Sequence, residues 1–208
     1  MTLACGLSSG LAALGLPLPE GAADRLSAYL ALLQKWNRVY NLTAIRDEAD
    51  MVTHHLLDSL AVVPYVAPLS TLADVGSGAG LPGLVMAMAL PHLQVISIEA
   101  VQKKAAFQQQ VKIELGLDNV TVVAGRVESF SSVRPVDAVI SRAFADLADF
   151  VSLTAHLASA KTRILAMKGV YPADEIARIP AGFAFERSIE LTVPGLDAER
   201  HLIIVKRT

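Results

Sequence analysis

A glycine-rich loop at residues 74–80, of sequence DVGSGAG, follows a short β-rich run and precedes a helical run that begins near Leu81. Glycines at alternate positions let the backbone turn sharply and come close to a bound nucleoside, because no Cβ stands in the way. The adjoining Pro82 suits the first turn of a helix, where its missing N–H would have no partner. This order of elements predicts a nucleoside-binding α/β fold.

From Leu72 onwards the chain alternates short β-rich runs with helical stretches, which is the pattern of a parallel sheet covered on both faces. The predicted strands are residues 71–75, 95–98, 120–123, 136–140 and 163–167. The predicted helices are residues 81–90, 102–115, 146–157 and 174–179. The regular alternation favours a doubly wound, mostly parallel sheet.

After Pro180 the pattern changes, because residues 183–193 and 201–206 are two β-rich runs without a helix between them. The turn sequence PGLD at residues 194–197 joins them, so they are expected to pair as an antiparallel hairpin. A parallel sheet with such a C-terminal hairpin is the arrangement of Rossmann-like class I methyltransferases. Nicotinamide-binding domains keep their strands parallel.

Two amphipathic helices are expected ahead of the sheet. Leu26, Leu30 and Leu33 recur at helical spacing within residues 22–39, and Asn41 and Thr43 break that pattern. A second helix is expected from a cap at residue 47 up to residue 64, where a proline stops it. We therefore expect an N-terminal helical cap region over residues 1–68 and a methyltransferase core over residues 69–208, forming one compact unit.

Composition supports a compact globular protein. Of the 208 residues 53% are hydrophobic and 18% charged, whereas disordered chains lack the apolar surface that offsets their ordering entropy.

No Lys or Arg precedes Arg25, and no apolar run reaches the roughly 20 residues of a membrane span, so a cytoplasmic protein without a membrane segment is expected. A lone Cys5 and five scattered His residues predict no disulfide and no metal site. The formal net charge of −2 leaves nucleic-acid binding open, since a local basic patch could contact phosphates.

Glu99 helps to distinguish between nucleoside cofactors. It ends the second predicted strand about 20 residues after Gly76, where a carboxylate can accept from both ribose hydroxyls. A nicotinamide dinucleotide would use the same carboxylate, but its fingerprint has a third glycine where Leu81 stands. The spacing of Gly76, Gly78 and Gly80 therefore favours S-adenosylmethionine. Asp74 is expected either to cap the loop backbone or to contact this cofactor.

The segment after the third predicted strand, residues 125–128, lies where such folds hold the adenine. Backbone N–H groups or a carboxylate would meet the edge of the base there, and a solvated Glu128 is the alternative. The expected cofactor contacts are Asp74, Gly76, Gly78, Gly80, Leu81, Glu99, Arg126, Val127, Glu128 and Arg142.

Several short sequence motifs have the same order and spacing as in one specific protein family. They are NLTAIRD at residues 41–47, HHLLDSL at 54–60, DVGSGAGLPG at 74–83, SRAF at 141–144, KG at 168–169 and DAERHL at 197–202. Together they resemble the bacterial small-subunit ribosomal RNA guanine-N7 methyltransferases, also called glucose-inhibited division protein B. The chain departs from the family at Ala79, where Pro is common, and at Glu99, where Asp is common. Both residues keep the required chemistry.

The resemblance implies methyl transfer from S-adenosylmethionine to N7 of one guanine in 16S ribosomal RNA near the decoding centre, with S-adenosylhomocysteine as product. N7 carries an in-plane lone pair and needs no deprotonation, so positioning should dominate over general base catalysis. A donor that leaves N7 free must hold O6, and Arg142 or Lys168 at strand ends could do so. Arg142 could instead pair with Asp74 or Glu99 or contact the cofactor carboxylate, and Lys168 could be a surface charge.

Residues of the cap are expected to form a wall facing the RNA. Asp58 could stabilise positive charge on the methylated ring, and His54 could stack on the base or bond to it, although capping or solvation is the alternative for each. The target guanine should be unstacked or in a loop. The residues considered for RNA contacts are Lys35, Arg38, Asn41, Arg46, His54, Lys103, Lys104, Arg126, Arg200, His201 and Arg207.

Two other functions compete with RNA methylation. A nicotinamide-dependent oxidoreductase is disfavoured by Leu81 and by the terminal hairpin. A non-catalytic RNA-binding or assembly factor with the same fold is disfavoured by the intact glycine loop and Glu99. The expected partner is 16S ribosomal RNA or a small-subunit particle, and the chain is expected to be a monomer.

Overall fold

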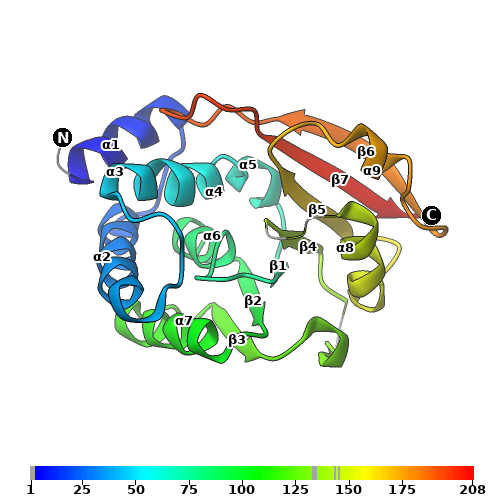
Figure 1. The fold of residues 1–208 in the computed structure, drawn as a ribbon, viewed down its shortest axis with the longest axis horizontal. Helices are drawn as coiled ribbons and strands as arrows, with labels where there is room; N and C mark the ends of the chain where they lie inside the picture. The colour runs from blue at the N-terminus through cyan, green and yellow to red at the C-terminus, as the bar shows by residue number, and fades with distance from the viewer. Residues whose placement is uncertain (1–2, 133–134, 143, 145) are drawn as a thin grey trace.

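The computed structural model describes residues 3–132, 135–142, 144 and 146–208. Within these residues a seven-stranded sheet has the order β3-β2-β1-β4-β5-β7-β6 (Figure 1). Strands β1 to β5 are parallel, and β7 pairs antiparallel with both β5 and β6. The predicted mostly parallel sheet with a C-terminal antiparallel hairpin is confirmed. The strands are β1 Thr71–Val75, β2 Gln94–Glu99, β3 Val120–Ala124, β4 Ala138–Ser141, β5 Arg163–Lys168, β6 Phe183–Glu190 and β7 His201–Arg207.

Helices cover both faces of the sheet (Figure 1). Alternate strand residues point to opposite faces, so Leu72 and Val95 belong to one hydrophobic cluster whereas Ala73 and Val139 belong to another. The first cluster also contains side chains of α2, α6 and α7, and the second contains those of α8. The longer helices are α1 Leu3–Leu14, α2 Ala22–Tyr40, α6 Gly83–Ala89, α7 Gln102–Leu115 and α8 Leu147–Thr154.

The first hydrophobic cluster spans the expected boundary at residue 68. It joins Leu26 and Leu30 of α2 and Leu56 of the cap to Leu84 and Val85 of α6. Full burial of one such aliphatic side chain contributes about 1.5–3 kcal/mol to stability. The cap and the sheet therefore share a core, and the division into residues 1–68 and 69–208 stays a prediction.

The second cap helix is continuous from Glu48 to Leu60 and widens into a π-helical stretch, Val52–Leu57, between α3 Glu48–Met51 and α4 Asp58–Leu60. Asp47 caps it by accepting from the backbone N–H groups of Ala49 and Asp50, which confirms the predicted N-terminus. Single π-helical turns inside α-helices occur often at functional sites. This one carries two adjacent histidines.

Two features of the cap differ from the sequence-based prediction. Helix α1 is not predicted, because its many small residues give no clear apolar stripe. It packs closely on the cap, since a Cβ on Gly10 would lie 2.4 Å from Leu57 Cδ1. Pro64 does not end the second helix, which stops at Leu60. The proline instead lies in the first turn of α5 Val63–Val66, where no N–H donor is needed.

Several other boundaries shift by a few residues. Helix α6 begins at Gly83 because Pro82 is its N-cap, β4 begins only at Ala138, and the last helix is the short α9 Ala173–Ile176. Strand β6 ends at Glu190 instead of residue 193. Its connection to β7 is therefore longer than the predicted turn and extends over the cap (Figure 1), where a Cβ on Gly195 would lie 3.6 Å from Thr53 Oγ1.

Candidate cofactor and substrate site

The glycine loop lies at the carboxyl end of β1 in a conformation that favours glycine. Gly76, Gly78 and Gly80 have φ angles of 67°, 60° and 89°, a region that residues with a Cβ rarely adopt. At Gly80 a side chain would also meet Leu84, because a Cβ would lie 2.3 Å from its Cδ1. The loop backbone can therefore approach a ligand closely.

Asp74 caps the helix that follows the loop. The carboxyl is fully buried, and its Oδ2 accepts from the backbone N–H of Gly83 at 2.8 Å, whereas its Oδ1 has no hydrogen-bond partner. Burial raises the pKa of Asp74 to about 7, although the Gly83 N–H and Arg142 act in the opposite direction. The predicted cap of the loop backbone is therefore replaced by a cap at the N-terminus of α6. Direct contact with a cofactor stays a prediction.

Glu99 fastens the loop to the neighbouring strand. Its Oε2 accepts from the N–H of Gly78 at 2.7 Å and its Oε1 from the N–H of Val101 at 2.8 Å. Each carboxylate oxygen has further acceptor capacity. Glu99 can therefore hold the loop and still accept hydrogen bonds from ligand hydroxyls.

Gln108 of α7 holds the loop from another side, and the sequence pattern does not identify it. Its Nε2 donates to Ser77 Oγ and to the carbonyl of Gly78, both at 2.8 Å, while its Oε1 accepts from Ser97 Oγ at 2.6 Å. The side chain is completely buried. A satisfied buried network of this kind gives rigidity without the cost of an unpaired polar group. The run of three glutamines on this helix gives no signal that would single out the buried one.

Tyr29 connects the cap to the same loop. Its hydroxyl donates to the carbonyl of Ala79 at 2.9 Å, and the side chain is fully buried. Burial raises the pKa of Tyr29, so the phenol stays a neutral donor. The ring also lies 6.1 Å from that of Phe107. The glycine loop is thus held by α2, α7 and β2 together.

Two adjoining cavities open at this edge of the sheet, and they share His55 and Arg142. One has a volume of about 250 Å³ and lies between the cap and the glycine loop. The other has a volume of about 350 Å³ and lies between the cap helix and the ends of β4, β5 and the β6–β7 connection. The first is lined by Leu42, Thr43, His55, Gly76, Ser77, Gly78, Ala79, Leu81 and Arg142, and the second by Ile45, His54, His55, Asp58, Arg142, Met167, Lys168, Gly169 and Arg200.

Arg142 stands where the cavities meet, and Asp58 holds it there. Its Nη1 donates to the carbonyl of His54 at 2.7 Å and to Asp58 Oδ2 at 3.1 Å. Asp58 Oδ1 accepts from Arg200 Nε at 3.0 Å, and the Asp58 side chain is only 4% exposed. The alternative pairing of Arg142 with Asp74 or Glu99 is therefore wrong, because the carboxylate bonded to it is on the cap helix. One carboxylate between two guanidinium groups leaves a net positive charge.

Lys168 is bonded within the protein. Its Nζ donates to Glu175 Oε2 at 2.7 Å and to the carbonyl of Phe144 at 3.1 Å. Glu175 also accepts from the N–H of Leu147, so the pair ties β5 to the starts of α8 and α9. The Lys168 side chain is 11% exposed. It is therefore not a solvated surface charge, and its charge in the cavity is balanced.

His55 separates the two cavities, although the sequence pattern draws attention only to its neighbour His54. The ring is buried, and its Nε2 lies 3.0 Å from Thr43 Oγ1. Burial, together with Arg142, lowers the pKa of His55 to about 4. The imidazole is therefore neutral near pH 7 and adds no third positive charge beside Arg142.

The neutral state of His55 predicts a loss of stability in acid. Its pKa is 6.5 in the unfolded chain and about 4 in the folded protein, so the unfolded state binds more protons between these values. The free energy of unfolding should fall as the pH decreases from 6.5 towards 4. Urea denaturation at pH 7.5 and pH 5.0 should show a smaller fall for His55→Gln than for the wild type. The exposed His92→Gln variant is the control, and an unchanged pH dependence in His55→Gln would contradict the prediction.

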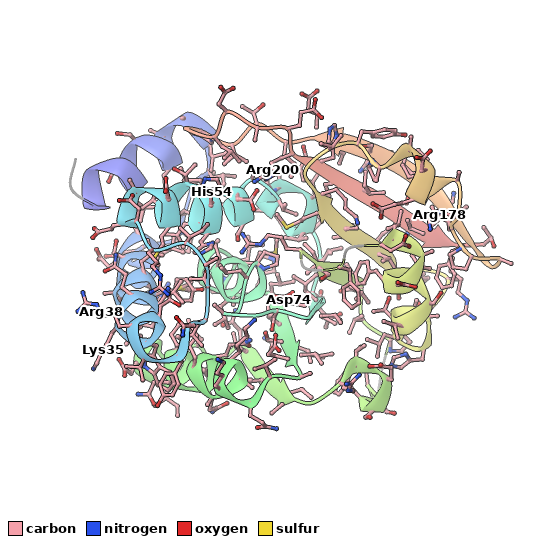
Figure 2. All side chains as sticks on the ribbon, in the orientation of Figure 1. Lys35, Arg38, His54, Asp74, Arg178 and Arg200 are labelled. Atoms are coloured by element: carbon pink, nitrogen blue, oxygen red, sulfur yellow. The ribbon has the colours of Figure 1, made fainter. Side chains whose placement is uncertain are left out.

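Other predicted RNA contacts lie outside the two cavities. Arg46 Nη2 donates to Asn41 Oδ1 at 2.8 Å on the exposed surface of the cap. Lys35 and Arg38 project outward from α2 (Figure 2), and Lys103 is exposed near the start of α7. Arg207 lies at the opposite end of the sheet, where it donates to the carbonyl of Ala158. Its proposed phosphate contact is therefore separate from the site.

The predicted adenine segment lies beside Glu99. The N–H of Gly125 donates to the Glu99 carbonyl, Val127 is buried, and Arg126 and Glu128 are exposed. Of the SRAF string, Ala143 lies outside the described residues. Over the described part of the chain, no three or more His, Cys, Asp or Glu side chains gather in a way that could hold a metal ion, and no helix has the length and apolar character to cross a membrane.

The sequence of this chain is similar to those of known methyltransferases. The model of the family described as rRNA small subunit methyltransferase G matches residues 22–203. A relative from Aromatoleum aromaticum named ribosomal RNA small subunit methyltransferase G is 62% identical over 98% of this chain and 99% of its own length. A relative of the same name from Neisseria meningitidis serogroup A is 55% identical over 97% of both chains.

Solved structures with a similar fold include several methyltransferases. A SAM dependent methyltransferase from Aquifex aeolicus has a TM-score of 0.59 and 17% identity over 77% of this chain and 94% of its own. The M1A22 tRNA methyltransferase TrmK of B. subtilis has a TM-score of 0.57 and 14% identity over 73% of this chain and 65% of its own. These likenesses confirm the predicted fold class.

Proposed function

The chain belongs to the rRNA small subunit methyltransferase G family, and from that membership we propose that it methylates N7 of one guanine in 16S ribosomal RNA near the decoding centre. The methyl donor is S-adenosylmethionine and the product S-adenosylhomocysteine. The observation that carries the proposal is the pair of adjoining cavities, one on the glycine loop and one on a positively charged wall. The reaction takes place in the cytoplasm, where ribosomal RNA is processed. No nicotinamide chemistry is proposed.

The residues of the first cavity fit S-adenosylmethionine, which supplies an electrophilic methyl group when bound. Gly76 and Gly78 present a backbone without side chains, and Glu99 beside them has acceptor capacity for ribose hydroxyls. Arg142, at the junction, can meet the carboxylate of the cofactor. Arg126, Val127 and Glu128 would hold the adenine.

The second cavity suits an extruded guanine. Arg142 uses Nη1 for its contacts with the cap, and its remaining N–H groups can donate to O6 or to the cofactor carboxylate. Lys168 is bonded to Glu175, so Arg142 is the better candidate for the O6 contact. The neutral His55 lies beside it and adds no charge. His54 and Arg200 line the same wall (Figure 2), which suits the approach of an RNA strand.

Positioning of the guanine accounts for catalysis without a general base. Guanine N7 has a free lone pair, so no proton has to be removed from the base before methyl transfer. Both oxygens of Asp58 accept from arginines, so Asp58 is already engaged within the protein. We assign it the role of a positioning residue instead of a stabiliser of the methylated ring. Alignment of two reacting groups can remove up to about 7–11 kcal/mol of the barrier in well-oriented systems. The Asp58 contacts that orient Arg142 therefore serve the chemistry directly.

A methylation assay tests the function. Radiolabelled methyl groups from S-adenosylmethionine should enter small-subunit RNA, and one site should become sensitive to N7-specific chemical cleavage. Incubation with naked RNA, an assembly intermediate and the mature subunit identifies which form of the substrate is used. Incorporation at a carbon or an exocyclic nitrogen would refute the N7 assignment. Absence of incorporation on all three would leave the non-catalytic assembly factor as the better account.

Gln108→Leu should weaken S-adenosylmethionine binding about tenfold. The substitution leaves Ser77, Ser97 and the carbonyl of Gly78 without their buried partner, which costs about 1–3 kcal/mol. Calorimetric titration should show the rise in Kd, and urea denaturation should show a lower free energy of unfolding. The control is Gln110→Leu on the same helix, whose amide donates to the exposed Glu114. A folded Gln108→Leu protein with the wild-type Kd would contradict the role of Gln108 in the loop.

A further inference from the structure

Two large apolar side chains are exposed directly after β5. Val170 is 74% and Tyr171 43% exposed. They follow Lys168 and Gly169, which both line the second cavity. Val39 and Tyr40 at the end of α2 form a similarly exposed pair, but Val170 and Tyr171 directly follow residues of the candidate substrate cavity. An exposed apolar patch often marks an interaction site.

The ring of Tyr171 has a defined place at the rim of that cavity. It meets the ring of His201 edge to face, with centroids 5.8 Å apart and an angle of 73°. His201 follows Arg200, which lines the cavity, and a Cβ on Gly169 would lie 3.9 Å from Arg200 Nη1. The β5–α9 loop and the start of β7 therefore adjoin at the cavity mouth. His201 is 13% exposed, so Tyr171 offers the larger aromatic surface.

The charge of the adjoining wall favours a nucleic acid strand over an apolar partner. Arg142 and Arg200 share the single carboxylate of Asp58, and the Lys168–Glu175 pair is neutral. The side chains that line the second cavity therefore carry an excess of one positive charge, which attracts phosphate, while the carboxylate of Glu199 lies outside this lining and 3.5 Å from His201 Nε2. An aromatic face next to a basic groove is the combination that binds unpaired nucleotides.

We propose that Tyr171 is a stacking platform for the unpaired nucleobase next to the target guanine. The proposal rests on the proposed function, because it needs an RNA whose guanine leaves its stack to enter the second cavity. The neighbouring base then loses a stacking partner, and an aromatic side chain at the cavity mouth replaces it. Tyr171 thereby contributes to the affinity for the strand without contacting the reacting atoms.

The platform predicts a selective defect in RNA binding. Tyr171→Ala should raise KM for the RNA substrate about 5- to 100-fold, as expected for loss of one stacked base, while kcat and the Kd for S-adenosylmethionine stay within twofold. Tyr171→Trp should bind as well as the wild type. Tyr171→Leu, which keeps apolar area without a π face, should resemble Tyr171→Ala. The control is Tyr65→Ala on α5, a tyrosine that is 36% exposed. An unchanged KM in Tyr171→Ala would overturn the proposal.

A fluorescent reporter tests the contact without turnover. Trp36 is the single tryptophan of the chain, so the double variant Trp36→Phe/Tyr171→Trp carries its only tryptophan at the platform. Saturable quenching by small-subunit RNA is expected, and RNA binding without quenching would overturn the proposal. If the wild type does not methylate small-subunit RNA, the proposed function fails, and quenching alone then decides whether RNA stacks on residue 171. Methylation by the wild type with no effect of Tyr171→Ala refutes only the platform.

Discussion

Arg142→Ala is expected to reduce kcat about 10²- to 10³-fold while the protein stays folded. Arg142 is the only charged side chain among the described residues that lines both cavities. Removal of one preorganised donor from an active site typically has an effect of this size. The fold should survive because Asp58 keeps Arg200 as a partner. Single-turnover methylation of small-subunit RNA measures the loss.

Two further variants sharpen the Arg142 experiment. Arg142→Lys keeps the charge but not the forked set of donors, so partial recovery would indicate a role of charge and no recovery a role of geometry. Arg178→Ala removes a guanidinium at a distant edge (Figure 2), where it pairs with Asp146, and should keep wild-type activity. Wild-type turnover of Arg142→Ala would remove Arg142 from the site.

Local patterns in the sequence predict much of the cofactor half of the site. The glycine spacing, the β-rich run before it and Glu99 at the next strand end are near-neighbour features of one βαβ unit, so their geometry follows from the backbone. The parallel alternation and the C-terminal hairpin predict the sheet in the same way. The hydrogen bond from the N–H of Gly78 to Glu99 was not predicted, and the contact of Glu99 with ribose hydroxyls stays a prediction.

Contacts between distant segments could not be predicted in this way. Asp58 lies 84 residues from Arg142 and 142 from Arg200, and no periodicity in the sequence reports such a pairing. Gln108 looks like one of many polar residues on a helix with little amphipathic character, until packing places it under the glycine loop. His55 lies in the π-helical stretch of the cap helix and is buried where the two cavities adjoin. Each case depends on tertiary packing that overrides the local signal.

The resemblance to a family identifies some of these distant residues, but it does not assign their individual roles. It points to His54, Asp58, Arg142 and Lys168 as a group, and the structure places all four around one cavity. It does not separate a residue that touches the substrate from one that orients another residue. The hydrogen bonds make that separation, because Asp58 and Lys168 are committed to partners within the protein whereas Arg142 keeps free donors.

Asp58→Ala is expected to lower the free energy of unfolding by about 3 kcal/mol and to reduce activity as strongly as Arg142→Ala. Breaking a buried ion pair by removing one partner typically costs about 3–5 kcal/mol, and solvent near the partly exposed arginines favours the lower value. Loss of the carboxylate leaves Arg142 and Arg200 close together without a counter-charge, so Arg142 no longer keeps its position. Urea denaturation and single-turnover methylation measure the two effects.

A double-mutant comparison separates charge from packing at Asp58. In Asp58→Ala/Arg200→Ala one of the two uncompensated cations is gone, so part of the lost stability should return, and the double variant should be more stable than the sum of the single effects predicts. Activity should stay low, because Arg142 has lost the carboxylate that orients it and is held by the carbonyl of His54 alone. Asp58→Asn, which keeps an acceptor of similar shape, should lie between the wild type and Asp58→Ala. Glu186→Ala breaks the more exposed pair with Arg163 and should cost about 1 kcal/mol or less. An Asp58→Ala protein as stable as Glu186→Ala would show that the carboxylate does not hold the two arginines together.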